Sequence, residues 1–218
     1  MTLGIISSVY GSATAEYTIK KSRFIASLQE VRTPDEAAAF IASIRKQYWD
    51  ARHNCYAYQL GPDGAVQKSN DDGEPAGTAG RPMLEVLKKG HITNTVVVVT
   101  RYFGGIKLGA SGLIRAYGHT VTAGLEAAQI ADYTPFAIVA TTFSYSFVSL
   151  LERTAAAAGL TIRDRQFGAD VTFTLQLPLD EAASWQADWT NQTNGTATFT
   201  DLGTESIPLI RQRERADS

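Results

Sequence analysis

The amino-acid sequence predicts an α+β protein built from two domains. Strand and helix patterns alternate through the first half, the stretch Tyr133-Thr134-Pro135 marks a boundary, and the second half reads β-α-β-β-α-β. With 218 residues, of which 44% are hydrophobic and 19% charged, the chain has an ordinary globular composition and a length that fits one large or two small domains. We expect domains at residues 1–134 and 135–210, followed by a charged tail at residues 211–218.

The first domain opens with strand-forming residues. Residues 17–31 are rich in β-formers and predict one long strand, or two strands joined by a bend at residues 20–22. Thr33 and Pro34 then supply an N-cap hydroxyl and a first-turn proline, and two acids follow them. This pattern predicts a helix to about residue 48.

A hairpin and a short helix come next. Residues 54–60 predict a strand, residues 61–64 form a strong turn signal, and residues 66–69 are expected to be the hairpin partner. We expect a loop at residues 70–82 and a short helix at residues 83–89.

A buried strand and a longer helix complete the first domain. Residues 94–102 contain four consecutive valines, which favour burial on both faces of a sheet. From residue 111 to about residue 129, apolar residues recur at steps of four and predict an amphipathic helix.

The second domain is predicted from its alternating pattern. The expected elements are a strand at 136–145, a helix at 147–158, strands at 161–167 and 169–177, a helix at 180–190 and a strand at 196–201. Their β-α-β-β-α-β order is that of a ferredoxin-like split unit. RRM-type RNA recognition is not expected here, because the third strand lacks the basic and aromatic motif of that module.

Charge and cysteine content limit the function classes. A single cysteine, Cys55, excludes a disulfide within the chain and indicates a cytoplasmic protein. No apolar stretch approaches the length of about 18–20 residues that a membrane helix needs, so we expect no membrane partner. The net charge of −2 and pI near 5.9 argue against tight nonspecific nucleic-acid binding by overall charge. Because residues 1–134 carry the excess of positive charge, a local basic site there stays open.

The first candidate site is the glycine-rich run at residues 101–112, where a buried strand ends and a helix begins. Glycines permit positive φ and close backbone approach, and the free N–H groups of a helix start favour an anion. The residues expected to bind an anion or a phosphate group are Arg101, Gly104, Gly105, Lys107, Gly109, Ser111 and Arg115. The alternative is a tight turn whose glycines serve packing alone.

The run matches neither the dinucleotide nor the Walker fingerprint. Residues 108–112, LGASG, look like the phosphate loop of the galactokinase/homoserine kinase superfamily, over a short and unspecific stretch.

The second candidate is the acidic loop at residues 70–82. Asp71, Asp72 and Glu74 present carboxylates that suit Mg²⁺ or Ca²⁺. The alternative is a rigid loop in which an acid caps backbone N–H groups and pairs with an arginine. We expect no cofactor, with Mg²⁺ as the alternative.

The third candidate is residues 51–58, ARHNCYAY. His53 and Cys55 share one face of a strand, but neighbours two apart lie about 7 Å apart at the backbone, which disfavours Cys–His catalysis. We predict no catalytic residue. The expected pocket residues are Arg52, His53, Asp71, Asp72, Glu74 and Arg81.

Four of these segments together resemble a known family. KSRFIA (residues 21–26), ARHNCYAY (51–58), DDGEPAGTAGRP (71–82) and TRYFGGIKLG (100–109) resemble the signature blocks of the IMPACT/YigZ family, in the family's order. The resemblance spans about residues 17–128. Residues 135–218 are similar to the extra C-terminal domain of bacterial members, itself likened to a terminal domain of elongation factor G.

The resemblance implies an N-terminal α+β sandwich like the second domain of a small-subunit ribosomal protein, and a role linked to translation. Eukaryotic members restrain a starvation-responsive translation kinase by competing for its activator. This chain starts directly at the shared domain, so we do not expect that role here.

The sequence leaves two main functions open. The first is a binding or regulatory protein that contacts RNA or the translation machinery through an anion-binding site in the first domain. The alternative is an enzyme acting on a phosphorylated or carboxylated small molecule with a metal-assisted acidic loop. A purely structural partner is a third reading, and the oligomeric state stays open.

Overall fold

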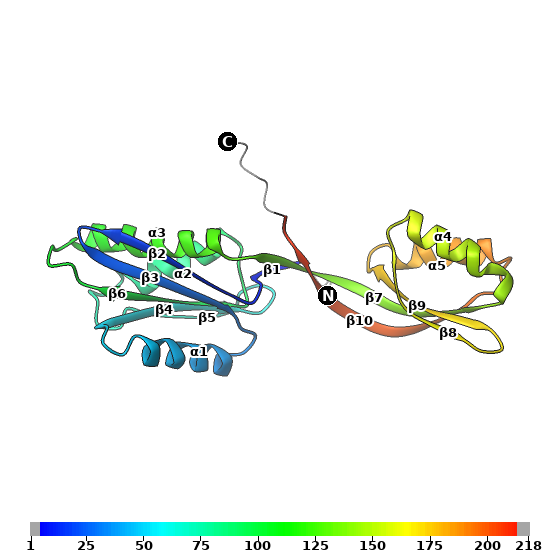
Figure 1. Ribbon diagram of the computed structural model, residues 1–218, viewed down its shortest axis with the longest axis horizontal. Coiled ribbons are helices and arrows are strands. Elements are labelled where there is room, and N and C mark those ends of the chain that lie inside the picture. The colour runs from blue at the N-terminus through cyan, green and yellow to red at the C-terminus, as the bar shows by residue number, and fades with distance from the viewer. Residues whose placement is uncertain (1–4, 213–218) are drawn as a thin grey trace. The chain divides into compact units, whose positions relative to one another are not determined.

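The computed structural model describes residues 5–212, which divide into two compact units (Figure 1). The first unit contains residues 5–133 and 208–212, and the second contains residues 134–207. The chain therefore leaves the first unit once and returns to it at Pro208, two residues before the end of the predicted second domain at residue 210. Of the predicted tail, residues 213–218 lie outside the described residues.

The first unit is built from eleven strand and helix segments. In chain order these are β1 (Ile6–Val9), β2 (Ser12–Ile19), β3 (Ser22–Glu30), α1 (Pro34–Gln47), β4 (His53–Leu60), β5 (Val66–Asn70), α2 (Gly80–Lys89), β6 (Thr95–Tyr102), α3 (Ala110–Ala127), the start of β7 (Ile130–Phe143) and the end of β10 (Thr198–Ile210). Five of the strands form an antiparallel sheet in the order β2-β3-β6-β4-β5. Helices α2 and α3 cover one face of this sheet and α1 covers the other (Figure 1).

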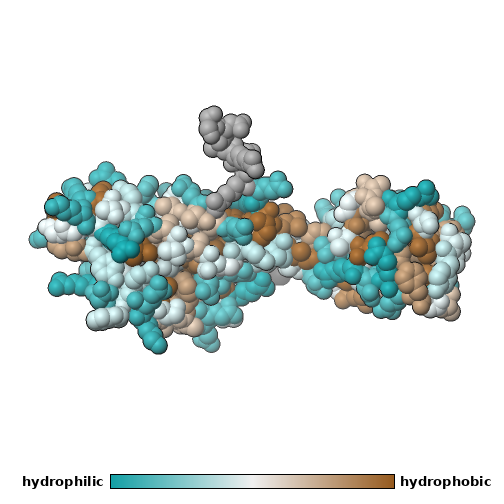
Figure 2. Space-filling model, in the orientation of Figure 1, coloured by the Kyte–Doolittle hydropathy of each residue, from teal (hydrophilic) through white to brown (hydrophobic). Residues whose placement is uncertain are grey.

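Among residues 5–212, no helix is long and apolar enough to cross a membrane. On the face visible in Figure 2, hydrophobic side chains are interspersed among hydrophilic ones. Scattered exposed apolar residues of this kind are normal on a protein surface and mark no site by themselves.

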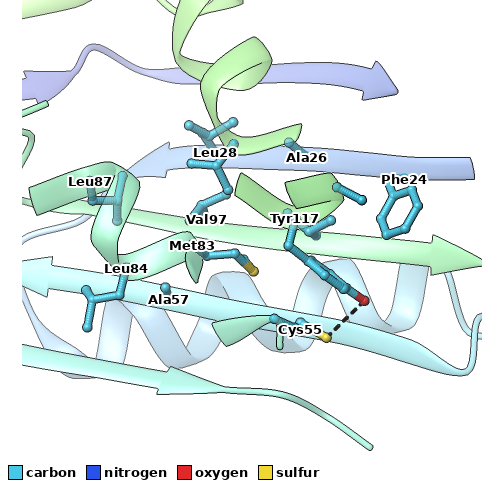
Figure 3. Packing of buried hydrophobic residues seen from close by; sticks show 14 of the residues in the cluster. Phe24, Ala26, Leu28, Cys55, Ala57, Met83, Leu84, Leu87, Val97 and Tyr117 are labelled. Carbon is cyan, nitrogen blue, oxygen red and sulfur yellow. Dashed lines mark hydrogen bonds between the residues drawn. The ribbon is translucent and has the colours of Figure 1, made fainter. Parts of the chain in front are cut away.

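The centre of the sheet is strand β6, as its valine run predicts. Val96, Val97, Val98 and Val99 are all fully buried. Val97 packs under α2 and α3 with Met83, Leu87 and Tyr117, as the close view of this core shows (Figure 3). Val99 belongs to the same cluster, while the other two valines pack under α1. A strand buried on both faces holds its two ends in fixed positions, and one of those ends carries the candidate site.

The β2–β3 connection is a two-residue turn. Lys20 and Lys21 both have positive φ, at 45° and 64°, and Ile19 pairs with Ser22 across the turn. Such turns match the twist of antiparallel strands. Of the two arrangements predicted for residues 17–31, the structure shows two strands joined at the predicted bend.

Helix α1 begins as its sequence signals indicate. The Thr33 side chain accepts a hydrogen bond from the Glu36 backbone N–H at 3.2 Å, and Pro34 occupies the first helical position. Helix α2 begins at Gly80, three residues before the predicted start. The Asp71 carboxylate satisfies the first backbone N–H groups of this helix, which accounts for the earlier start.

The boundary predicted at residues 133–135 coincides with the division between the two units at Tyr133 and Thr134. Strand β7 runs unbroken through Pro135 and begins at Ile130, six residues before the predicted strand start at residue 136. Residues Ile130–Tyr133 pair with β1, and residues Phe136–Phe143 pair with β9. Pro135 lies between these two registers, where neither β1 nor β9 needs its missing N–H group. Strand β1 itself was not predicted.

The second unit contains the expected β-α-β-β-α-β order. Its further elements are the short 3-10 turn η1 (Tyr145–Phe147), α4 (Val148–Ala157), β8 (Thr161–Phe167), β9 (Val171–Pro178) and α5 (Ala182–Gln192). The sheet order is β10-β7-β9-β8, and the buried face of β9 packs on both helices around Trp189. The last strand continues well past its predicted end at residue 201.

Candidate functional site

A cavity of about 740 Å³ lies in the first unit, where β6 ends and α3 begins. Three chain segments far apart in sequence supply its walls: residues 50–53, residues 74–75 and residues 101–113. The acidic loop and the glycine-rich run, which the sequence could present only as separate candidates, therefore line one cavity.

One side of the cavity carries positive charge. Lys107 and Arg52 line it, both are exposed, and neither forms an ion pair with any described residue. Helix α3 begins beside them with Gly109 at its N-cap, and no side chain caps its first N–H groups. Free N–H groups at a helix start carry partial positive charge. These three features together favour an anion.

The segment that precedes β4 also brings a carboxylate to the cavity, that of Asp50. Asp50 Oδ1 accepts a hydrogen bond from the Tyr102 hydroxyl at 2.7 Å, and burial of that hydroxyl, more than Asp50 itself, raises the Tyr102 pKa. This interaction ties the residues that precede β4 to the end of β6.

The glycines of the run have different tasks. A Cβ at Gly104 would lie 2.0 Å from the backbone carbon of Lys21, and the Gly104 N–H donates to Ser22 Oγ at 3.1 Å. The packing alternative is therefore right for Gly104. Gly105 and Gly109 instead have φ of 84° and 73°, with nothing near the position of a Cβ. They let the chain turn into α3.

Arg101 is not a free anion ligand. Its side chain is buried and Nη1 lies 2.6 Å from Glu74 Oε1, which also accepts a hydrogen bond from the Tyr117 hydroxyl at 2.8 Å. Burial, together with the nearby Cys55 and Glu74, raises the Tyr117 pKa far above its ordinary value, so the phenol stays a proton donor. Glu74 compensates the arginine charge. The Arg101 Nε has no partner among the described residues.

Cys55 belongs to the same buried group. Its Sγ lies 2.9 Å from the Asp71 carbonyl oxygen and 3.3 Å from the Tyr117 hydroxyl, the contact drawn in Figure 3. Burial raises the Cys55 pKa to about 12, so the thiol stays protonated. His53 turns instead to the Asp72 carbonyl oxygen, 2.9 Å from Nδ1. A Cys–His pair is not formed.

The acidic loop uses its carboxylates to hold its own shape. Asp71 accepts hydrogen bonds from the backbone N–H groups of Gly77, Ala79 and Gly80, at 2.8, 2.9 and 2.8 Å. Burial alone would raise the Asp71 pKa, but these three hydrogen bonds outweigh it and lower the pKa. Asp72 accepts from the Asn54 N–H and pairs with Arg45 at 2.6 Å. The arrangement is that of the rigid capped loop described as the alternative to a metal site. Among residues 5–212, no group of three or more His, Cys, Asp or Glu side chains is placed to hold a metal ion.

The predicted site residues divide into three groups. Those that line the cavity are Arg52, His53, Glu74, Arg101, Lys107 and Gly109. Those that shape the segments around it without lining it are Asp71, Asp72, Gly104, Gly105 and Ser111. Arg81 and Arg115 line a second cavity of about 510 Å³ between α2 and α3, together with Lys89.

Seven residues that line the cavity were missed by the sequence reasoning: Asp50, Pro75, Tyr102, Phe103, Leu108, Ala110 and Leu113. Of these, Phe103 is 55% exposed. For Phe103 the signal was present in the sequence, because a glycine-rich connection has no packing need for a large aromatic residue at its first position.

Comparison with known proteins connects this site to a family. Residues 20–125 match the model of the Impact N-terminal domain, and residues 141–196 match a domain of unknown function, DUF1949. The chain is 44% identical over 180 residues to the IMPACT family member YvyE of Bacillus subtilis, with 83% of each chain covered. It is 36% identical to the IMPACT family member YigZ of Escherichia coli, over 82% of this chain and 88% of the relative.

The chain belongs to the IMPACT family. A crystal structure of a hypothetical protein, 32% identical, covers 91% of this chain and 98% of its own with a TM-score of 0.59. The rabbit Protein IMPACT is 35% identical over 97 residues, which are 42% of this chain and 30% of that protein. All the residues that line the cavity fall within the Impact N-terminal domain match. The site is therefore part of the family domain.

Proposed function

We propose that this IMPACT family chain is a cytoplasmic regulatory protein linked to translation, which contacts RNA through the cavity at the start of α3. The observation that carries the proposal is the meeting of Lys107, Arg52 and the uncapped α3 N-terminus at one cavity. The link to translation rests on the resemblance to the IMPACT/YigZ family.

The electrostatics support a local phosphate contact. The whole chain carries a net charge of −2, so its overall field does not attract RNA. At the cavity, an ammonium group, a guanidinium group and backbone N–H groups supply the donors that phosphate oxygens accept. Binding through so few contacts is expected to be weak and sensitive to salt.

Binding is favoured over metal-assisted catalysis by the state of the acidic loop. The carboxylates of Asp71, Asp72 and Glu74 each already accept hydrogen bonds or form ion pairs with other parts of the first unit. A carboxylate recruited by Mg²⁺ would have to give up partners that shape the loop.

The test is binding of a fluorescently labelled single-stranded oligouridine, followed by anisotropy between 50 and 200 mM salt. We expect the affinity of the double variant Arg52→Glu/Lys107→Glu to fall by at least about tenfold, since the variant removes two phosphate contacts. The slope of log affinity against log salt should become shallower by about 1.4, at about 0.7 for each single-strand contact.

The matched control is Lys46→Glu. Lys46 is exposed in the last turn of α1, which covers the opposite face of the sheet from α2 and α3. This variant should bind like the wild-type protein. Absence of binding at low salt, or an equal loss in the control, would overturn the proposal.

A further inference from the structure

Phe103 stands out among the exposed apolar residues because of what lies behind it. Exposed hydrophobic side chains occur elsewhere on the surface (Figure 2), but Phe103 lies at the wall of the cavity, between the end of β6 and Lys107. More than half of its side chain is open to solvent. Its supporting contacts indicate a specific use.

The ring of Phe103 is backed by a guanidinium group. The Arg101 Cζ lies over the ring, 5.6 Å from its centre, and over the ring of the fully buried Phe24, 5.4 Å from that centre. Phe24 in turn packs edge-on against Tyr117, with the ring centres 5.2 Å apart. Arg101 thus forms cation–π contacts with one buried ring and one exposed ring.

The Arg101 guanidinium is held in its position against the Phe103 ring by burial and by an ion pair. Arg101 is only 7% exposed, and its outer end forms the ion pair with Glu74, whose carboxylate is itself held by a hydrogen bond from the Tyr117 hydroxyl. Because Glu74 neutralises the arginine, a second anion gains little from it. A buried, compensated cation against an aromatic ring serves to position that ring.

We infer that Phe103 is a stacking platform for a nucleobase, and that the RNA at the cavity is single-stranded. The inference rests on the proposed function and names its substrate class. Lys107 and Arg52 hold the phosphate while the exposed part of Phe103 receives the base of the same or the next nucleotide. Single-strand binding sites combine a cationic track with aromatic residues in this way. In a duplex the bases are stacked on one another and do not reach such a ring.

The test separates the base from the phosphate. Three labelled probes are compared by anisotropy: a single-stranded oligouridine, the same backbone with abasic positions, and a duplex of the same length. Wild-type protein should prefer the base-bearing single strand over the abasic strand by about five- to a hundredfold, the range for one stacked base. Equal affinity for the two single strands would overturn the inference.

Variants of Phe103 locate the effect. Phe103→Leu keeps an apolar side chain but removes the aromatic face, so it should lose the preference for bases and leave abasic-strand affinity unchanged. Phe103→Trp should retain the preference, and its added fluorescence should be quenched by the base-bearing strand only. An equal loss for both strands in Phe103→Leu would contradict a stacking role.

The outcome also distinguishes this inference from the proposed function. If Arg52→Glu/Lys107→Glu weakens RNA binding while Phe103→Leu binds both strands like the wild-type protein, the phosphate site stands and the stacking platform is wrong. If wild-type protein binds none of the probes at low salt, both are wrong.

Discussion

The acidic loop and the glycine-rich segment differ in what their charges already contact. In the loop, Asp71, Asp72 and Glu74 all have partners within the first unit. In the segment from Phe103 to Gly109, Lys107 makes no ion pair with any described residue. Both segments are rich in glycine in the sequence. In the proposed function, the charge left without a partner belongs to the side of the cavity that binds, and the charges with partners belong to its scaffold.

This contrast has an energetic basis. A buried carboxylate is tolerated only when hydrogen bonds or an opposite charge replace the water it loses. Glu74 is 8% exposed and meets both requirements through Arg101 and Tyr117. Lys107 stays in solvent, so it needs no partner in the folded chain and is available to a ligand.

The largest effect is expected for Glu74→Ala. It leaves the Arg101 guanidinium buried without a counter-charge, and breaking a buried pair in this way costs about 3–5 kcal/mol of unfolding free energy. Urea denaturation of the first unit measures the loss. The control is Glu85→Ala, whose exposed carboxylate lies 3.8 Å from Lys88 and whose removal should change stability by less than about 1 kcal/mol. Similar small losses in both variants would show that the loop is not scaffold.

A smaller loss of unfolding free energy is expected for Gly104→Ala. This variant tests whether one residue of the glycine-rich segment also serves as scaffold. Although Gly104 belongs to the glycine-rich segment, an added Cβ would meet the backbone of Lys21 and Ser22 at 2.0–2.3 Å. We expect a loss near the upper end of the about 1–3 kcal/mol typical of overpacking. Gly105→Ala is the matched control, because its position is open and only its positive φ costs energy, about 1–2 kcal/mol. A larger loss for Gly105→Ala would contradict the close approach of the two turns.

Local signals predicted most of the fold. The Thr33-Pro34 cap, the valine run in β6 and the alternation in β9 each depend on neighbours in sequence, and the structure has all three elements. The strand predicted to start at residue 136 begins at Ile130 instead, because Ile130–Tyr133 pair with β1, a strand that was not predicted. That pairing joins segments far apart in the sequence, so nothing local indicates it.

The site was predicted less completely, also for reasons of geometry. Arg101 and Glu74 lie 27 positions apart, and nothing local indicates that they pair. Arg115 follows Leu113, a cavity residue, by two positions on α3, which turns it about 200° around the helix axis. It therefore faces the second cavity with Arg81 instead. Counting cations along the sequence overlooked this rotation.

The smallest expected loss of unfolding free energy is that of Asp71→Asn. Its dependence on pH tests whether the charge of Asp71 holds the acidic loop in shape, as the comparison with the glycine-rich segment requires. Hydrogen bonds from three backbone N–H groups lower the Asp71 pKa in the folded protein, despite the opposing effect of burial. A lowered folded-state pKa stabilises the fold above the unfolded-state value of about 3.9, and this contribution is lost as the pH falls through the folded value. At pH 7 the variant should lose about 1 kcal/mol, the usual cost of a lost helix-capping carboxylate.

Urea denaturation at pH 7, 5 and 3 measures the difference between wild-type and Asp71→Asn. It should be largest at pH 7 and 5 and shrink toward pH 3, because protonation removes the same charge from the wild-type protein. Glu126→Gln, which neutralises an exposed carboxylate on α3, should show little difference at any of these values. A difference in unfolding free energy between wild type and Asp71→Asn that stays constant from pH 7 to pH 3 would mean that the Asp71 charge does not hold the loop. The acidic loop would then not be a charge-stabilised scaffold, and it would not differ in this respect from the glycine-rich segment.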